Sequence, residues 1–181
     1  MPRKILLMGL GTLLGFGGLG WILITYFQKE SVQEVLFRGE GFTHQLLGGI
    51  IAGILAALLA IFVISRAFFA KEFSFYKELI GHFKWSGFSI FFVSVCAGVG
   101  EEMFFRAGLQ PLLGLWWTSI VFVALHGYLN PLNWRITVYG VLMVLVIAGF
   151  GWMFENLGIW SAMAAHAVFD WVLISYLLRK R

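Results

Sequence analysis

Long apolar runs separated by short polar stretches fill most of the chain. Six of these runs approach the ~20 residues that a helix needs to cross the hydrocarbon core of a bilayer. They cover residues 5–27, 45–69, 86–113, 115–130, 136–154 and 158–178. The third run carries Pro111 near its end, where we expect the helix to bend or stop. The pattern predicts an all-α fold, a polytopic membrane helix bundle of about six transmembrane helices, forming a single domain over residues 1–181.

Composition agrees with a lipid environment. Hydrophobic residues make up 60% of the chain and charged residues only 12%, against about 25% charged residues in typical soluble domains. The single cysteine, Cys96, excludes a disulfide framework. The first apolar run is too long for a typical signal-peptide core and lacks a small-residue cleavage site, so we expect it to be retained as a span.

Basic residues predict the orientation in the membrane. If the N-terminus is cytoplasmic, Lys29 and Arg38 fall in outer loops and Arg106 falls in a span. The other basic residues then lie on the inner side: Arg3, Lys4, Arg66, Lys71, Lys77, Lys84, Arg135, Arg179, Lys180 and Arg181. This bias follows the positive-inside rule. We therefore expect a multi-pass protein of the cell inner (plasma) membrane with both termini cytoplasmic. The net charge of +4 comes from residues at the ends of apolar segments, so the expected partner is membrane lipid and not nucleic acid.

The last four predicted spans contain six charged or histidine side chains, each of which costs a few kcal/mol at that depth and needs a reason. They are Glu101, Glu102, Arg106, His126, His166 and Asp170. Glu102 and Arg106 are four residues apart and share a helix face, so they can pair, and we expect them to support the site. His166 and Asp170 have the same spacing. Glu101 lies about 100° around the helix from Glu102 and has no obvious local partner.

Depth in the membrane brings these residues together. Glu101 lies 13 residues before Gly114, a predicted outer turn, and His126 lies 12 residues after it. In an antiparallel hairpin both would sit about 18–20 Å below the turn, at ~1.5 Å per residue. The polar pair of the last span follows the next outer turn, Gly158, and reaches overlapping depths. Three helices are therefore predicted to converge on one polar cluster.

Such a cluster is suited to hydrolysis. Burial disfavours the charged form of a carboxylate, so Glu101 could deprotonate a water near neutral pH. His126 would position that water, and His166 would donate to the oxyanion of a tetrahedral intermediate. In a membrane the plausible substrate is a peptide or a membrane-embedded protein segment.

Other readings of the same residues stay open. Glu101, His126 and His166 could hold zinc with an open water position, although no His-Glu-x-x-His pair favours a metal. Intramembrane carboxylates and histidines also build proton pathways, so a proton-coupled transporter is an alternative. A further alternative is a non-proteolytic membrane partner, such as a bacteriocin-immunity protein.

Three motifs, each inside an apolar span, carry a family resemblance. Glu101-Glu-Met-Phe-Phe-Arg106 resembles a Glu-Glu-x-x-x-Arg motif, Phe122-Val-Ala-Leu-His126 a Phe-x-x-x-His motif, and His166-Ala-Val-Phe-Asp170 a His-x-x-x-Asn/Asp motif. In this order they are similar to the motifs of the CAAX prenyl endopeptidase and bacteriocin-processing family, abbreviated CPBP or Abi. The resemblance covers about residues 86–178.

The resemblance implies an intramembrane endopeptidase that cleaves a membrane-associated or C-terminally anchored protein or peptide at a membrane-proximal site. It implies Glu101 as the base that activates water, His126 as its partner, and His166 and Asp170 as stabilisers of the oxyanion. Family members are described both as metalloproteases and as glutamic proteases. We favour the glutamic type without a cofactor, with zinc as the alternative. Asp170 departs from the common asparagine, and because an ionised aspartate can only accept hydrogen bonds, it could be protonated, orient His166 or favour a metal.

Overall fold

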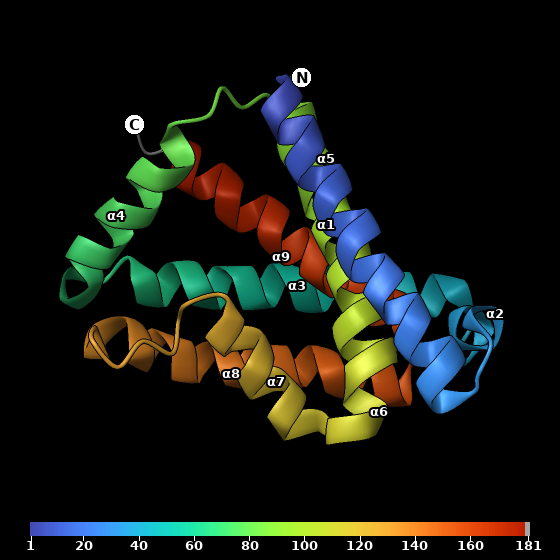
Figure 1. The fold of residues 1–181 in the computed structure, drawn as a ribbon. Coiled ribbons are helices and arrows are strands. Elements are labelled where there is room, and N and C mark those ends of the chain that lie inside the picture. Colours follow the sequence, from blue (N-terminus) through green and yellow to red (C-terminus); the bar gives the residue numbers. More distant parts are fainter. Residues whose placement is uncertain (180–181) are drawn as a thin grey trace.

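Five helices long and apolar enough to cross a membrane account for most of residues 1–179, the part of the chain that the computed structural model describes (Figure 1). Lys180 and Arg181, counted in the predicted orientation, lie outside this part. The five spans are Arg3–Gln28, Phe42–Ile64, Gly87–Leu113, Trp134–Asn156 and Ile159–Arg179. They comprise α1 (Arg3–Ile22) with a π-helical extension (Leu23–Gln28), α3, α5 to α6, α8 and α9. The predicted all-α membrane bundle is confirmed.

The predicted span 115–130 is wrong in length. Helix α7 covers only Leu115–Leu125, which at ~1.5 Å per residue is about half of the ~30 Å hydrocarbon core. The helix ends because Gly127 takes a positive φ of 77°, which leaves the helical region. The chain then runs through a non-helical segment, residues 126–133, to α8 (Trp134–Asn156).

Segment 126–133 forms hydrogen bonds to the start of α8 through part of its backbone. The Thr137 hydroxyl donates to the Asn130 carbonyl at 2.7 Å and accepts from the Asn130 amide at 3.0 Å. The Tyr128 carbonyl lies so close to Gly140 of α8 that a Cβ there would stand 2.4 Å from its oxygen. The segment is therefore packed against α8, and a glycine is required at the contact.

The third span changes its helical geometry directly after the two glutamates. Helix α5 (Gly87–Glu102) continues as a π-helical stretch, Met103–Leu109, and then as α6 (Gln110–Leu113). The helix stops two residues beyond Pro111, as predicted from the sequence. π-helical turns occur frequently at functional sites.

The second predicted span, 45–69, also ends early. Helix α3 covers Phe42–Ile64, and a 3₁₀ turn (Ala67–Phe69) leads into α4 (Ala70–Gly81), a helix within the predicted loop. Buried Glu72 fixes α4 to the bundle by accepting a hydrogen bond from the Asn133 amide at 3.1 Å. The short helix α2 (Val32–Phe37) lies in the first polar loop.

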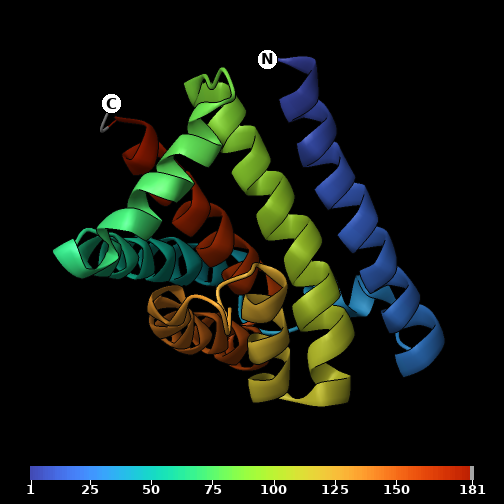
Figure 2. The ribbon, with the colours of Figure 1, turned by 60° about the vertical axis from the view of Figure 1, so that its left-hand side comes forward.

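The long helices pack in two parallel pairs that meet through α5 and α9. Helix α1 runs beside α5, and α3 runs beside α9 (Figures 1 and 2). Gly98 allows α5 to approach α9, because a Cβ there would lie 2.7 Å from the Met163 carbonyl oxygen. Gly100 allows the same approach to α1, at 2.7 Å from the Thr12 carbonyl oxygen. The glutamates that follow Gly100 are thereby carried to the point where α5, α7 and α9 meet.

Candidate active site

Glu101 and His126 face each other across α5 and the end of α7. The distance between Glu101 Oε2 and His126 Nε2 is 3.3 Å, which confirms the equal depth predicted from the sequence. His126 Nδ1 lies 2.7 Å from the Phe122 backbone carbonyl. Because a carbonyl only accepts, Nδ1 carries a proton, and in a neutral ring Nε2 is left as the acceptor that faces Glu101.

His166 lies between two carboxylates. Its Nδ1 donates to Glu102 Oε1 at 2.8 Å, and its Nε2 stands 3.6 Å from Asp170 Oδ2. Glu102 Oε2 also accepts from Arg106 Nε at 2.9 Å. The predicted pairings of Glu102 with Arg106 and of His166 with Asp170 are both present. The sequence did not reveal that Glu102 also holds His166 directly, from α5 to α9.

Arg106 extends this network to α8. Its guanidinium donates to Gln110 Oε1 at 3.0 Å and to the Ile147 carbonyl at 3.1 Å. Gln110 Nε2 in turn donates to Glu155 Oε1 at 2.7 Å. Gln110 was missed in the sequence, although its spacing of four from Arg106 places it on the same face. Glu155 carries no comparable signal, because only the fold brings α8 to α6.

The Phe122 ring contacts the rings of both histidines. The His126 ring stacks on it, with ring centroids 4.4 Å apart and an interplanar angle of 14°. The His166 ring meets it edge-on at 5.6 Å. The Phe122 residue is only 5% exposed. This single aromatic side chain from α7 therefore fixes the two imidazoles relative to each other.

Exposure divides the cluster into a buried and an accessible end. Glu102 and Arg106 are fully buried, whereas the side chains of His126 and Asp170 are 35% and 26% exposed. Glu101 lies between, and its contact with His126 lacks hydrogen-bond geometry, so among the described residues Glu101 Oε2 has no hydrogen-bond partner. This buried carboxylate oxygen therefore faces the partly exposed His126 ring with its hydrogen-bonding capacity unused.

The alternative zinc ligands, Glu101, His126 and His166, do not converge on one point. In residues 1–179, no three His, Cys, Asp or Glu side chains are placed to ligate an ion. His166 Nδ1 is already bonded to Glu102. We therefore derive no step of the chemistry through a metal.

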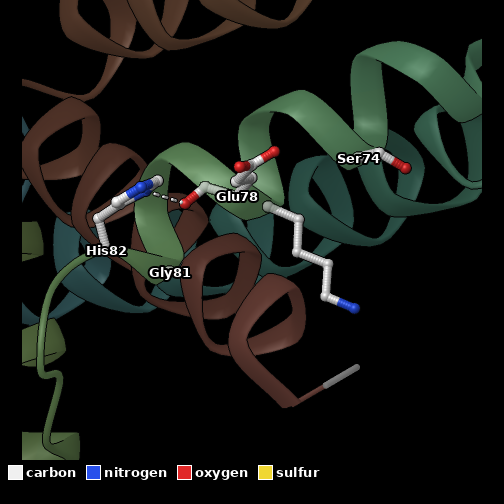
Figure 3. Close-up of a pocket in the computed structure, with 5 residues that line it drawn as sticks. Ser74, Glu78, Gly81 and His82 are labelled. Carbon is white, nitrogen blue, oxygen red and sulfur yellow. Dashed lines mark hydrogen bonds between the residues drawn. The ribbon is translucent and has the colours of Figure 1, made fainter.

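A separate cavity of about 380 Å³ lies along α4 (Figure 3). Its lining consists of Ser74, Lys77, Glu78, Gly81 and His82. His82, the residue after α4, donates from Nδ1 to the Glu78 carbonyl of that helix at 2.7 Å. Because this lining comes from α4 and not from the buried cluster, the cavity does not belong to the candidate active site.

Comparison with known proteins gives two matches. Residues 83–172 match the family described as type II CAAX prenyl endopeptidase Rce1-like. The chain is also 36% identical over 83 residues to the uncharacterized protein YpbD of Bacillus subtilis (strain 168). That match covers 45% of this chain and 41% of YpbD, so the chain spans less than half of that relative. No solved structure matches the chain.

Proposed function

Since the chain belongs, through residues 83–172, to the CAAX prenyl endopeptidase family, we propose that it is an intramembrane endopeptidase in which a glutamate activates the attacking water. The observation that supports this proposal best is the Glu101–His126 pair at 3.3 Å, at the accessible side of a buried network. A catalytic base must lie within hydrogen-bond reach of the proton that it removes, directly or through one water. The two atoms are so close that one water lying beside them can hydrogen-bond to both.

Glu101 and His126 carry out the attack. Glu101 accepts a proton from the water, while the unprotonated Nε2 of His126 accepts the second O–H and aims the oxygen. The water oxygen bonds to the scissile carbonyl carbon, and the carbonyl electrons move to oxygen. Glu101 then gives its proton to the leaving nitrogen as the C–N bond breaks. The products are an amine and a carboxylic acid, which then gives its proton to the amine or to solvent, and Glu101 ends as it began.

His166 and Asp170 stabilise the oxyanion. In its doubly protonated form, His166 donates Nδ1–H to Glu102 and presents Nε2–H on the side of Asp170. Two flanking carboxylates favour this charged ring. As negative charge develops on the carbonyl oxygen, Nε2–H turns from Asp170 to the oxyanion, where a charged donor is worth more than a neutral one. Asp170 therefore accepts the Nε2–H of His166 before the oxyanion forms and does not itself donate to the substrate.

Glu102 and Arg106 position this machinery without touching the substrate. Arg106 keeps Glu102 ionised, and Glu102 keeps the proton on His166 Nδ1. The chain from Glu102 to Glu155 links α5 with α8, and the Glu102–His166 bond links α5 with α9. The buried pair is costly in isolation, and its full hydrogen bonding compensates that cost.

The substrate that we propose is a membrane-associated protein or peptide, cut near the membrane surface. Five long apolar helices make the chain a multi-pass membrane protein. We further propose that it lies in the cell membrane with both termini cytoplasmic, following the distribution of basic residues. No metal takes part in the proposed steps, and zinc remains the alternative that chelation must test.

The experiment compares membranes from cells that express the wild type or Glu101→Gln. New protein N-termini are identified by mass spectrometry, and proton flux is measured with the same proteins in liposomes. We expect N-termini that require Glu101 and no Glu101-dependent proton flux. Proton flux without new N-termini would contradict the proposal in favour of a transporter, and neither signal would favour a binding partner such as an immunity protein.

A further inference from the structure

A second cavity, of about 200 Å³, lies between α4, α9 and the segment after α7. Apolar side chains of α9 form one wall. The other walls come from Phe73, Tyr76 and Ile80 of α4 and from Tyr128 and Tyr139. Asp170 is the one carboxylate that the described residues contribute to this lining. The cavity is therefore mainly apolar and aromatic, and within residues 1–179 its wall contains one charged residue.

This cavity adjoins the candidate active site at two points. Asp170, which lines it, places Oδ2 3.6 Å from His166 Nε2. Tyr128, which also lines it, stacks parallel to His126 with ring centroids 6.3 Å apart and an interplanar angle of 12°. Asp170 therefore separates the cavity from His166, and Tyr128 separates it from His126.

The volume fits one side chain. An engineered apolar cavity of about 150 Å³ is known to bind benzene, so about 200 Å³ accommodates a phenyl ring or a branched aliphatic group and is too small for a long lipid chain. We propose that this cavity receives one bulky apolar side chain, of leucine or phenylalanine size, from the substrate residue beside the scissile bond. The proposal rests on the proposed endopeptidase function.

The phenol groups suit this use because they are neutral. Burial, together with the nearby Glu72 carboxylate, raises the pKa of Tyr76 above its ordinary value, so its ring stays uncharged at physiological pH. Asp170 is held by His166 at the edge of the site. A basic substrate side chain would have to compete for that carboxylate, which is why an apolar occupant fits better.

Helix α4 supplies the part of the wall that can be altered without touching the active site. Phe73, Tyr76 and Ile80 follow the i, i+3, i+7 spacing of one helix face, and this face covers the cavity. Tyr76 meets Tyr128 with ring centroids 5.7 Å apart. Leu79 is 52% exposed and does not line the cavity. Ile80→Trp should therefore fill the cavity, while Leu79→Trp adds the same side chain outside it.

The test uses palmitoylated, internally quenched peptides that share one backbone and carry Ala, Leu, Phe or Lys on either side of a central bond. The wild type should cleave the Leu and Phe peptides at least about tenfold faster than the Ala peptide, at one of the two positions only. Ile80→Trp should reduce this ratio to about one, and Leu79→Trp should retain it. An equal loss on all peptides with Ile80→Trp, or a preference for Lys, would overturn the proposal.

A second measurement separates this proposal from the proposed function. The Glu101→Gln protein is irradiated with the same peptide carrying photo-leucine, and the crosslinked residues are mapped by mass spectrometry. We expect crosslinks within residues 73–80 and 170–177 that Ile80→Trp suppresses. Crosslinks elsewhere overturn the cavity proposal even if the wild type cleaves. Crosslinks at these residues without any wild-type cleavage support the binding site and overturn the endopeptidase.

Discussion

The substitution Glu102→Gln separates the positioning network from the catalytic base. Glu102 accepts Arg106 Nε with one oxygen and His166 Nδ1–H with the other, and both Glu102 and Arg106 are fully buried. A glutamine has the same shape but one acceptor atom and no charge. It leaves either Arg106 or His166 facing an N–H group, and it leaves the Arg106 charge uncompensated.

The expected cost follows from the burial of the pair. Removing one partner of a buried ion pair costs about 3–5 kcal/mol of folding free energy. The effect on the reaction is separate. Without Glu102 the doubly protonated His166 loses one of its two carboxylates, so its donor to the oxyanion becomes neutral. A charged hydrogen bond contributes about 1–1.5 kcal/mol more than a neutral one, so activity should fall about tenfold or more in the protein that remains folded.

The assay is equilibrium unfolding in mixed micelles together with the cleavage rate of folded protein. Glu155→Gln is the matched control, because Glu155 belongs to the same network but is exposed, and a glutamine can still accept from Gln110. The control should lose less than about 1 kcal/mol. If Glu102→Gln unfolds within about 1 kcal/mol of the wild type, Glu102 does not balance Arg106 as described.

Four further predictions concern other parts of the molecule. Gly140→Ala should displace the Tyr128 carbonyl and lower activity at least tenfold. Gly149→Ala, on the same helix with open space around it, should leave activity unchanged. Equal activities of the two variants would show that segment 126–133 needs no close contact with α8. Arg106→Lys should destabilise the fold by about 2–4 kcal/mol, because a lysine cannot reproduce the guanidinium bonds to Glu102, Gln110 and Ile147, and an unchanged unfolding curve would refute this. The purified protein should stay active after treatment with a chelator, and elemental analysis should find less than one zinc per chain. One zinc per chain together with activity that a chelator abolishes would show a metalloprotease instead. In Cys96→Ala protein, a cysteine at Gln33 should react with an impermeant maleimide from outside the cell and one at Lys84 should not; the reverse pattern would invert the orientation.

The positions of Glu101 and His126 relative to each other were predicted from the sequence more accurately than the length of α7, the helix that His126 follows. Counting residues from Gly114 placed Glu101 and His126 at the same depth, and they do lie 3.3 Å apart. That count succeeds because both residues lie at nearly equal numbers of helical residues from one turn, although the third span includes the π-helical stretch Met103–Leu109. The same reasoning extended α7 to residue 130, and it failed because the helix ends at Leu125 and Gly127 takes a positive φ of 77°.

The contacts between distant helices could not be predicted in the same way. The spacing of Glu102 and Arg106 showed a shared face, and Gln110 continues it. Nothing in the sequence, however, indicated that His166 would bond to Glu102 instead of relying on Asp170 alone. That bond depends on the close approach of α5 to α9 at Gly98. Helix α4 escaped prediction because its charges made it look like a loop.

The central claim is that Glu101 is the base that activates water, and one comparison tests it most directly. Glu101 Oε2 has no hydrogen bond among the described residues, so Glu101→Gln should unfold like the wild type, unlike the neighbouring Glu102→Gln. Loss of a general base should lower the cleavage rate of the purified protein by about 10²–10⁴-fold. A Glu101→Gln protein that cleaves within a few-fold of the wild-type rate would contradict the account.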